Sequence, residues 1–385
     1  MTTSFWLHSM PFSLPDLSTD IIIVGGGFVG LSTAYWLSEL NPNLKIVVLD
    51  RGQLGAGASG RNAGFLTKGS AYFYKSLGQK WGVEGAQSIL KFAEESLKLV
   101  YDHFLKTSSS IDFIPTTSMT LFKNEKLHQD LDFDAKSFGF EWRNESELPE
   151  NLRSKFYGGL ETSPEYKVTP VHLLEALKQK LEARKIKVLE NVSAFKVTPD
   201  GVMTDSFVLR GKKVILALNG YFPQFHEVFK PLIIPHRAQM LAVELEKDFN
   251  CPSLYYDPPE RVYWRKVHDR TIIFGGKRLL DEKGEVGDFE KISPLIQAGL
   301  ESYVGDLLGL KYKVLHRWSG TMGFTDHELP ILKKISAPIE TYVVGGFSGH
   351  GMGLGFRSAL EMAQLVTGQK QTSFFQTFKD NTINL

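Results

Sequence analysis

The feature that most constrains the fold is a glycine-rich turn at residues 25–30, Gly-Gly-Gly-Phe-Val-Gly, with the spacing GxGxxG. Four β-branched residues, 21–24, precede it and predict a strand buried on both faces. Apolar residues at helical spacing follow it until Asn41-Pro42 ends the helix, and a second strand is predicted over 45–49. A β-α-β unit pairs its strands in parallel with a right-handed crossover, so we expect an α/β domain.

This turn has the parts that a dinucleotide site needs. Gly25 permits the tight turn, Gly27 lets the backbone approach a pyrophosphate, and Gly30 lets the helix pack closely on the strand. The helix N-terminus supplies N–H groups and a partial positive charge for the phosphates. Asp50, twenty residues after Gly30, can accept hydrogen bonds from ribose hydroxyls. We therefore predict dinucleotide binding; the alternative is a tight turn without a ligand.

The loop after the second predicted strand is rich in glycine and alanine. Residues 55–64 are Gly-Ala-Gly-Ala-Ser-Gly-Arg-Asn-Ala-Gly. Most of these side chains are small, so a ligand could approach the backbone of this loop closely. The sequence resembles flavoproteins of the D-amino-acid oxidase superfamily, in which this loop runs under the pyrophosphate and ribityl chain. The resemblance extends from Asp20 to about Gly368. Within the superfamily, the sequence looks most like the branch that contains gamma-glutamylputrescine oxidases.

Two further stretches carry the resemblance. Residues 213–220, Lys-Val-Ile-Leu-Ala-Leu-Asn-Gly, are similar to the family's second nucleotide-contacting strand, with Asn219 as a departure, and Val192 matches a position whose backbone meets the adenine. Residues 345–352, Gly-Gly-Phe-Ser-Gly-His-Gly-Met, are similar to the final flavin loop. This loop opens a helix, whose N-terminus stabilises the negative charge that reduction places at the flavin N1/C2=O edge.

The resemblance implies FAD as the cofactor. The superfamily's cysteine attachment lies where this chain has Ser319, and its histidine attachment lies where it has Asn62, so we expect non-covalent FAD. The residues assigned to the cofactor are Gly25, Gly26, Gly27, Phe28, Val29, Gly30, Asp50, Arg51, Ala58, Ser59, Arg61, Asn62, Ala63, Gly64, Val192, Ala217, Asn219, Gly220, Gly346, Gly349, His350, Gly351 and Met352.

The resemblance also implies two domains: a Rossmann-like FAD-binding domain of the glutathione-reductase type, and a mostly antiparallel substrate domain. Alternating polar and apolar residues between Tyr221 and Trp318 agree with an antiparallel sheet. Helices are predicted over 84–106, 171–185 and 289–308, and an irregular arm over 1–19. The proposed boundaries are 1–80, 151–220 and 326–385 for the FAD-binding domain, and 81–150 and 221–325 for the substrate domain.

The segment after Trp318 bears on the choice of substrate. Glycine and D-amino-acid oxidases usually carry an arginine after a Trp-x-Gly segment to hold the substrate carboxylate, and Met322 stands there. We therefore expect hydride transfer from a C–N bond of an amine to flavin N5, giving an imine that hydrolyses. The candidate substrate-contacting or catalytic residues are Arg265, Arg278, Trp318 and His350.

Two alternatives stay open. The first is a glycine or D-amino-acid oxidase or dehydrogenase, in which Arg265, Arg278 or Arg317 replaces the missing arginine. The second is a flavin-binding protein without turnover. His350 can either shape its loop or contact flavin or substrate, and O2 or a quinone is expected to take the electrons.

Composition excludes several classes of protein. With 44 basic and 43 acidic residues the net charge is +1, which argues against a nucleic-acid-binding protein. The single cysteine, Cys251, excludes an intramolecular disulfide and a zinc site built on cysteines, and no metal is expected. No apolar run is long enough for a transmembrane helix, and the start of the sequence does not resemble a signal peptide, so we expect a cytoplasmic enzyme.

Overall fold

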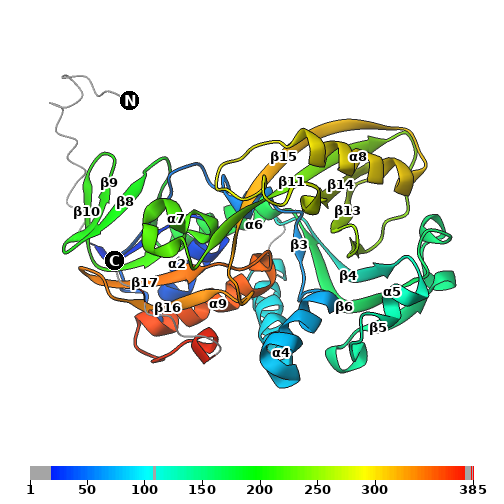
Figure 1. Ribbon diagram of the computed structural model, residues 1–385. Helices are drawn as coiled ribbons and strands as arrows, with labels where there is room; N and C mark the ends of the chain where they lie inside the picture. Colours follow the sequence, from blue (N-terminus) through cyan, green and yellow to red (C-terminus); the bar gives the residue numbers. More distant parts are fainter. Residues whose placement is uncertain (1–18, 107–109, 378–382, 384) are drawn as a thin grey trace.

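The structure, a computed structural model, describes residues 19–106, 110–377, 383 and 385. It contains two large sheets that lie side by side (Figure 1). The arm predicted over 1–19 lies outside the described residues except for Thr19, which begins the first strand. Across the described residues, no helix is both long and apolar enough to cross a membrane.

The first sheet contains the predicted β-α-β unit. Its parallel strands follow the order β17-β10-β1-β2-β7, and β16 pairs antiparallel with β17 at one edge. β8 and β9 form a hairpin that continues from β10. The bounds are β1 Thr19–Val24, β2 Ile46–Leu49, β7 Lys187–Leu189, β8 Ala194–Thr198, β9 Gly201–Thr204, β10 Val208–Leu216, β16 Ile331–Ile335 and β17 Glu340–Gly345.

Strand β1 is buried on both faces, as predicted. Ile21 and Ile23 pack into a core with the helices α2, Phe28–Leu40, and α9, Gly351–Val366. Ile22 and Val24 face a second core on the opposite side of the sheet. Helix α6, Pro170–Ala183, joins the first core through its leucines.

Helices α2 and α9 pack directly on each other, although they are more than 300 residues apart. The Trp36 indole N–H donates to the carbonyl of Phe356 at 3.1 Å, and the ring of Phe356 stacks on Phe28 at 6.3 Å between centroids. Both helices begin after glycine-rich turns at the carboxyl ends of parallel strands. This packing therefore brings the two turns together at one edge of the sheet.

The second sheet has the order β15-β11-β14-β13-β12-β4-β6-β3, with β5 beside β6. Its pairs are antiparallel except β12 with β4. Helix α8, Pro294–Leu308, covers one face, where Ile296 and Leu300 meet Trp264. The bounds are β3 Phe65–Leu66, β4 Phe113–Phe122, β5 Glu141–Asn144, β6 Gly158–Val168, β11 Ile234–Leu245, β12 Leu254–Asp257, β13 Val262–His268, β14 Thr271–Gly276 and β15 Tyr312–Phe324.

The fold class is confirmed: a parallel α/β sheet is joined to a mostly antiparallel one. The domain boundaries remain a proposal. β3 and β6 fall in the ranges assigned to the FAD-binding domain but pair with the second sheet, so 65–66 and 158–168 belong structurally with that sheet. The short helices are α3 Ala58–Arg61, α5 Glu125–Gln129 and α7 Phe222–Phe225.

One helix is longer than predicted. Helix α4 covers Ala71–Val100 and continues as a π-helical turn over Tyr101–Leu105, whereas the prediction began at 84. Ser70 caps the true start by accepting from the N–H of Phe73 at 3.3 Å. Gly82, at φ +74°, breaks the helical path, and this interruption hid the first turns from the pattern of apolar spacing.

Candidate active site

A single cavity of about 1220 Å³ runs from the glycine turns of the first sheet to the second sheet. Its volume exceeds the range of about 300–1000 Å³ that suits a drug-sized ligand, so it has room for a dinucleotide and a further small molecule. We refer to its two parts as the nucleotide end, next to β1 and β2, and the substrate end, next to β12, β13 and β14.

Steric limits account for the first glycine turn. A Cβ on Gly25, which has φ +113°, would lie 2.4 Å from the carbonyl oxygen of Ala217. A Cβ on Gly30 would lie 1.8 Å from the carbonyl oxygen of Gly25. Gly27 lines the cavity, and a Cβ there would lie 2.9 Å from Ser59 Oγ. Glycine is therefore required for the turn, for helix–strand packing and for the floor of the cavity.

Asp50 ties the turn to the end of β2. Its Oδ2 accepts from the N–H of Gly26 at 2.7 Å, and its Oδ1 accepts from the N–H of Gly52 at 2.8 Å. Burial raises the pKa of the carboxyl, and these two hydrogen bonds oppose the shift. Each oxygen keeps a lone pair, so the carboxylate can also accept from ribose hydroxyls.

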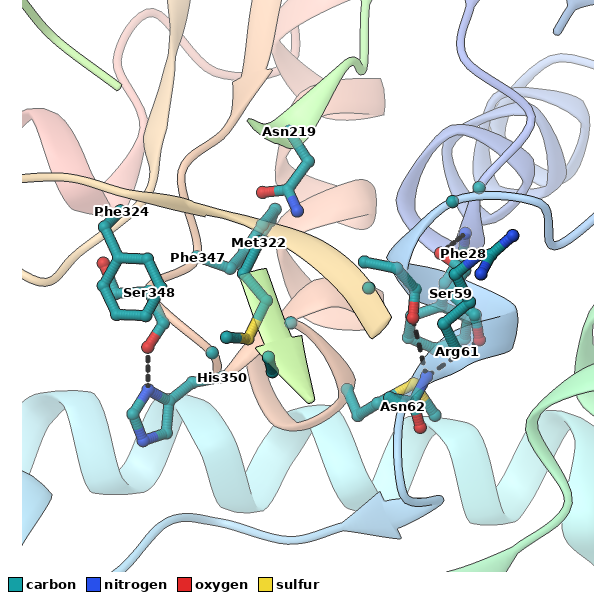
Figure 2. A pocket seen from close by; sticks show the side chains of 18 of the residues that line it. Phe28, Ser59, Arg61, Asn62, Asn219, Met322, Phe324, Phe347, Ser348 and His350 are labelled. Carbon is teal, nitrogen blue, oxygen red and sulfur yellow. Dashed lines mark hydrogen bonds between the residues drawn. The ribbon is translucent and has the colours of Figure 1, made fainter. Parts of the chain in front are cut away.

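The loop of residues 55–64, called the small-residue loop below, is held in place by its own polar side chains (Figure 2). Ser59 Oγ accepts from the N–H of Phe28 at 2.8 Å, which fixes the loop to the start of α2. Asn62 donates to the carbonyl of Ser59 at 2.8 Å and accepts from the N–H of Gly64 at 2.8 Å. Arg61 donates from Nη1 to the carbonyl of Ser319 at 3.1 Å, so the loop is also fixed to β15.

Asn219 connects the end of β10 to the C-terminal loop. Its Oδ1 accepts from the N–H of Gly346 at 3.2 Å, and its backbone is left-handed at φ +46°. Asparagine tolerates this conformation better than most residues, which gives a physical reason for the departure noted in the sequence. A Cβ on the adjacent Gly220 would lie 2.9 Å from the carbonyl of Met322, so this segment packs directly on β15.

His350 lies at the start of α9 and stacks on Phe73 with 3.6 Å between ring centroids. Its Nδ1 lies 3.0 Å from the carbonyl oxygen of Ser348 (Figure 2). Burial lowers the pKa of His350 to about 4, so the ring is neutral near pH 7 and donates from Nδ1 to that carbonyl. This geometry gives His350 a loop-shaping role and leaves Nε2 as an acceptor.

Most of the residues assigned to the cofactor border the cavity. Five do not, and they lie behind its wall: Gly26, Gly30, Gly64, Gly220 and Gly346. Those that line it are Gly25, Gly27, Phe28, Val29, Asp50, Arg51, Ala58, Ser59, Arg61, Asn62, Ala63, Val192, Ala217, Asn219, Gly349, His350, Gly351 and Met352.

The structure does not bring Arg265 or Trp318 to the cavity. Arg265 is 5% exposed, and its guanidinium donates to the carbonyls of Ala63 and Val168. Burial lowers its pKa to about 10. The Trp318 indole donates to the carbonyl of Arg61 at 2.9 Å. The expected contact with substrate is replaced by a supporting role, because both side chains lie under the small-residue loop.

Arg278 does line the cavity, and Met322 lines it on β15 as the sequence indicated. Sequence reasoning missed several other residues of the substrate end. These come from α4, β11, β12 and the turn before β13: Tyr72, His236, Tyr256 and Arg261. The available signal was the polar turn 257–261 between two aromatic strands.

Comparison with known proteins agrees with this geometry. The family model DAO, FAD dependent oxidoreductase, matches residues 20–365. The chain belongs to this family. The probable oxidoreductase OrdL of Rhizobium meliloti (strain 1021) is 23% identical over 367 residues, which cover 91% of this chain and 83% of the relative. The gamma-glutamylputrescine oxidoreductase of Escherichia coli (strain K12) is 23% identical over 377 residues, with coverages of 92% and 85%.

A solved structure shares the fold. The glycine oxidase from Bacillus cereus ATCC 14579 aligns with a TM-score of 0.72 at 19% identity, covering 92% of this chain and 96% of the other. Family membership makes this chain an FAD-dependent oxidoreductase, and the predicted FAD cofactor is confirmed at that level. The cavity fits the cofactor, because Gly27 leaves space for a pyrophosphate that any Cβ would narrow.

Proposed function

We propose that the protein oxidises the C–N bond of an amine to an imine, which water then hydrolyses. The observation that carries the proposal is one continuous cavity, which joins the nucleotide end to a chamber with an aromatic and thioether wall. When bound there, FAD supplies the hydride acceptor at N5 and passes the two electrons on to O2 or a quinone. The wall residues include Tyr72, Met240, Tyr256, Tyr263 and Met322.

The chamber suits a neutral amine at the moment of oxidation. An apolar wall disfavours the ammonium form and so lowers the pKa of a bound amine, which frees the nitrogen lone pair. The name of the gamma-glutamylputrescine oxidoreductase supports an amine donor, and the name of the glycine oxidase supports a C–N bond donor in general. Met322 offers no hydrogen bond to a carboxylate next to the reacting carbon, and an unpaired carboxylate there costs several kcal/mol.

A glycine or D-amino-acid oxidase is the second candidate function. The observation in its favour is that Arg278 lines the same cavity and is partly buried. The third alternative is a flavin-binding protein without turnover. Any substrate that reduces the flavin would exclude it.

Anaerobic flavin reduction tests the proposal. Primary and secondary amines without an α-carboxylate, including acylated putrescines, are expected to bleach the flavin faster than glycine or D-alanine does. Fast bleaching by glycine or D-alanine, with none by the amines, would overturn the amine proposal and favour the amino-acid one. Readmission of O2 with hydrogen peroxide detection then distinguishes an oxidase from a dehydrogenase.

The mode of attachment has its own test. Ser319 and Asn62 occupy the two expected attachment positions, and neither side chain forms a flavin bond of the cysteine or histidine type. Acid precipitation is therefore expected to release FAD into the supernatant. Flavin absorbance that remains in the washed pellet would contradict non-covalent binding.

A further inference from the structure

Two arginines meet at the substrate end of the cavity. Arg261 lies in the turn before β13, and Arg278 follows β14 at the start of a 3-10 turn. The strands pair with Val262 opposite Gly276, and the N–H of Lys277 donates to the carbonyl of Arg261 at 3.2 Å. This pairing fixes the two arginines as neighbours on one hairpin, and both side chains line the cavity.

Two acidic side chains next to this arginine pair already have lysine partners. Glu260 forms an ion pair with Lys123 at 2.7 Å and a second one with Lys277. Asp257 lies 3.6 Å from Lys123 and accepts from the Tyr303 hydroxyl at 2.8 Å. Within the described residues, no carboxylate lies within ion-pair distance of either arginine. Glu282 acts on Arg278 from beyond that distance, so the pair presents two positive charges to the cavity without an ion-paired carboxylate.

The surroundings of the arginine pair are those of an oxyanion site. Tyr256, which also lines the cavity, forms a hydrogen bond with Arg261. Burial, followed by the charge of Arg261, lowers the pKa of Arg278. A bound anion would relieve the repulsion between the two guanidinium groups, and a planar guanidinium can hold a carboxylate through two parallel hydrogen bonds.

The position of the pair differs from that of the arginine that Met322 replaces. The guanidinium carbon of Arg278 lies 4.7 Å from the centre of the Phe324 ring. Phe324 lies two residues beyond Met322 on β15, which is about 7 Å along a strand. Figure 2 shows Met322 and Phe324 at separate places in the cavity, with Phe324 next to Ser348. An anion held by Arg278 is therefore displaced from the Met322 position by the length of several carbon–carbon bonds.

We infer that Arg261 and Arg278 bind a carboxylate of the substrate that is separated by several carbon atoms from the oxidised C–N bond. The substrate class is then an amine with a remote acid group. This inference rests on the proposed amine oxidation and narrows it. It also accommodates a methionine next to the reacting carbon, because that carbon needs no carboxylate of its own.

The test compares amines of equal length with and without a terminal acid. The probes are 4-aminobutanoate and 5-aminopentanoate against butylamine and pentylamine, with glycine as the short acid. We expect the two ω-amino acids to reduce the flavin with a kred/Kd about tenfold above their neutral partners, and glycine to gain nothing. Arg261→Gln and Arg278→Gln should each remove that advantage, so that the ratio of kred/Kd between each ω-amino acid and its neutral partner falls to about one.

A matched control and a second readout keep folding and turnover apart from binding. Arg270→Gln makes the same charge change at an exposed ion pair with Glu244, away from the cavity, and should change neither rate nor affinity. Butanoate and pentanoate should perturb the flavin absorbance of the wild type without reducing it. Their Kd should rise about tenfold in Arg261→Gln and Arg278→Gln but stay constant in Arg270→Gln.

The outcomes separate this inference from the proposed function. If no amine reduces the flavin but the alkanoates bind and lose affinity in both cavity variants, the arginine pair is an acid site and amine oxidation is wrong. If amines reduce the flavin but acids give no advantage, or alkanoate affinity is equal in wild type and both variants, the inference is overturned. A tenfold advantage for glycine over methylamine would overturn the remote position of the acid group.

Discussion

The two ends of the cavity are built in different ways. At the nucleotide end the main chain makes the site: Gly25 and Gly30 leave no space for a Cβ, and Asp50 closes the turn through backbone N–H groups. At the substrate end side chains make it, including Arg261 and Arg278 from one hairpin. A site built from the main chain requires particular residues, here glycines, at fixed positions. A site built from side chains can be formed by different residues, provided that the cavity keeps its shape and charge.

The largest effect should come from filling the floor of the nucleotide end. Gly27→Val places a side chain against Ser59 Oγ and into the cavity, so the purified variant is expected to retain less than about a tenth of the wild-type flavin. Gly305→Val on α8 is the matched control, since a Cβ there meets nothing within 4 Å. The measurement is the ratio of flavin to protein absorbance. Stoichiometric flavin in Gly27→Val would contradict the claim that the main chain forms the nucleotide end of the cavity.

A smaller effect is expected at Arg265, which donates hydrogen bonds under the small-residue loop. Arg265→Met removes buried donors from the carbonyls of Ala63 and Val168 and should lower the free energy of unfolding by about 2–4 kcal/mol. Arg270→Met, at an exposed ion pair, should cost less than about 1 kcal/mol. Thermal and denaturant unfolding measure both. Equal losses in the two variants would show that Arg265 does not support the small-residue loop.

The smallest effect concerns pH. Burial lowers the pKa of His350 from its ordinary value of 6.5 to about 4, so the unfolded chain binds a proton that the folded one does not between these values. The stability of the wild type should therefore fall relative to His350→Phe as the pH drops from 6.5 to 4, with no pH-dependent difference above 7. Unfolding temperatures at pH 5, 6 and 8 test this, since phenylalanine keeps the stack on Phe73. Parallel pH profiles would contradict a folded state that keeps the His350 ring neutral.

The same contrast explains how far the sequence could lead. The strand at 21–24, the GxGxxG turn and the helix after 351 were predictable, because sterics and burial dictate the residue at each place. The first turns of α4 were not, since Gly82 interrupts their apolar spacing. Arg265 and Arg261 both belong to the segment around β13, and the sequence favoured Arg265 as the pocket residue. Only the tertiary contact with the carbonyl of Ala63 shows that Arg265 is withdrawn from the cavity.

The packing of α9 on α2 has a consequence for biosynthesis. The turn that opens α2 is translated more than 300 residues before His350 and Met352, which line the same cavity. The carbonyl of Phe356, which accepts the indole hydrogen bond of Trp36, is translated equally late. The full cofactor site therefore exists only after both segments have been synthesised, and a nascent chain that stalls before 351 lacks one wall of that site.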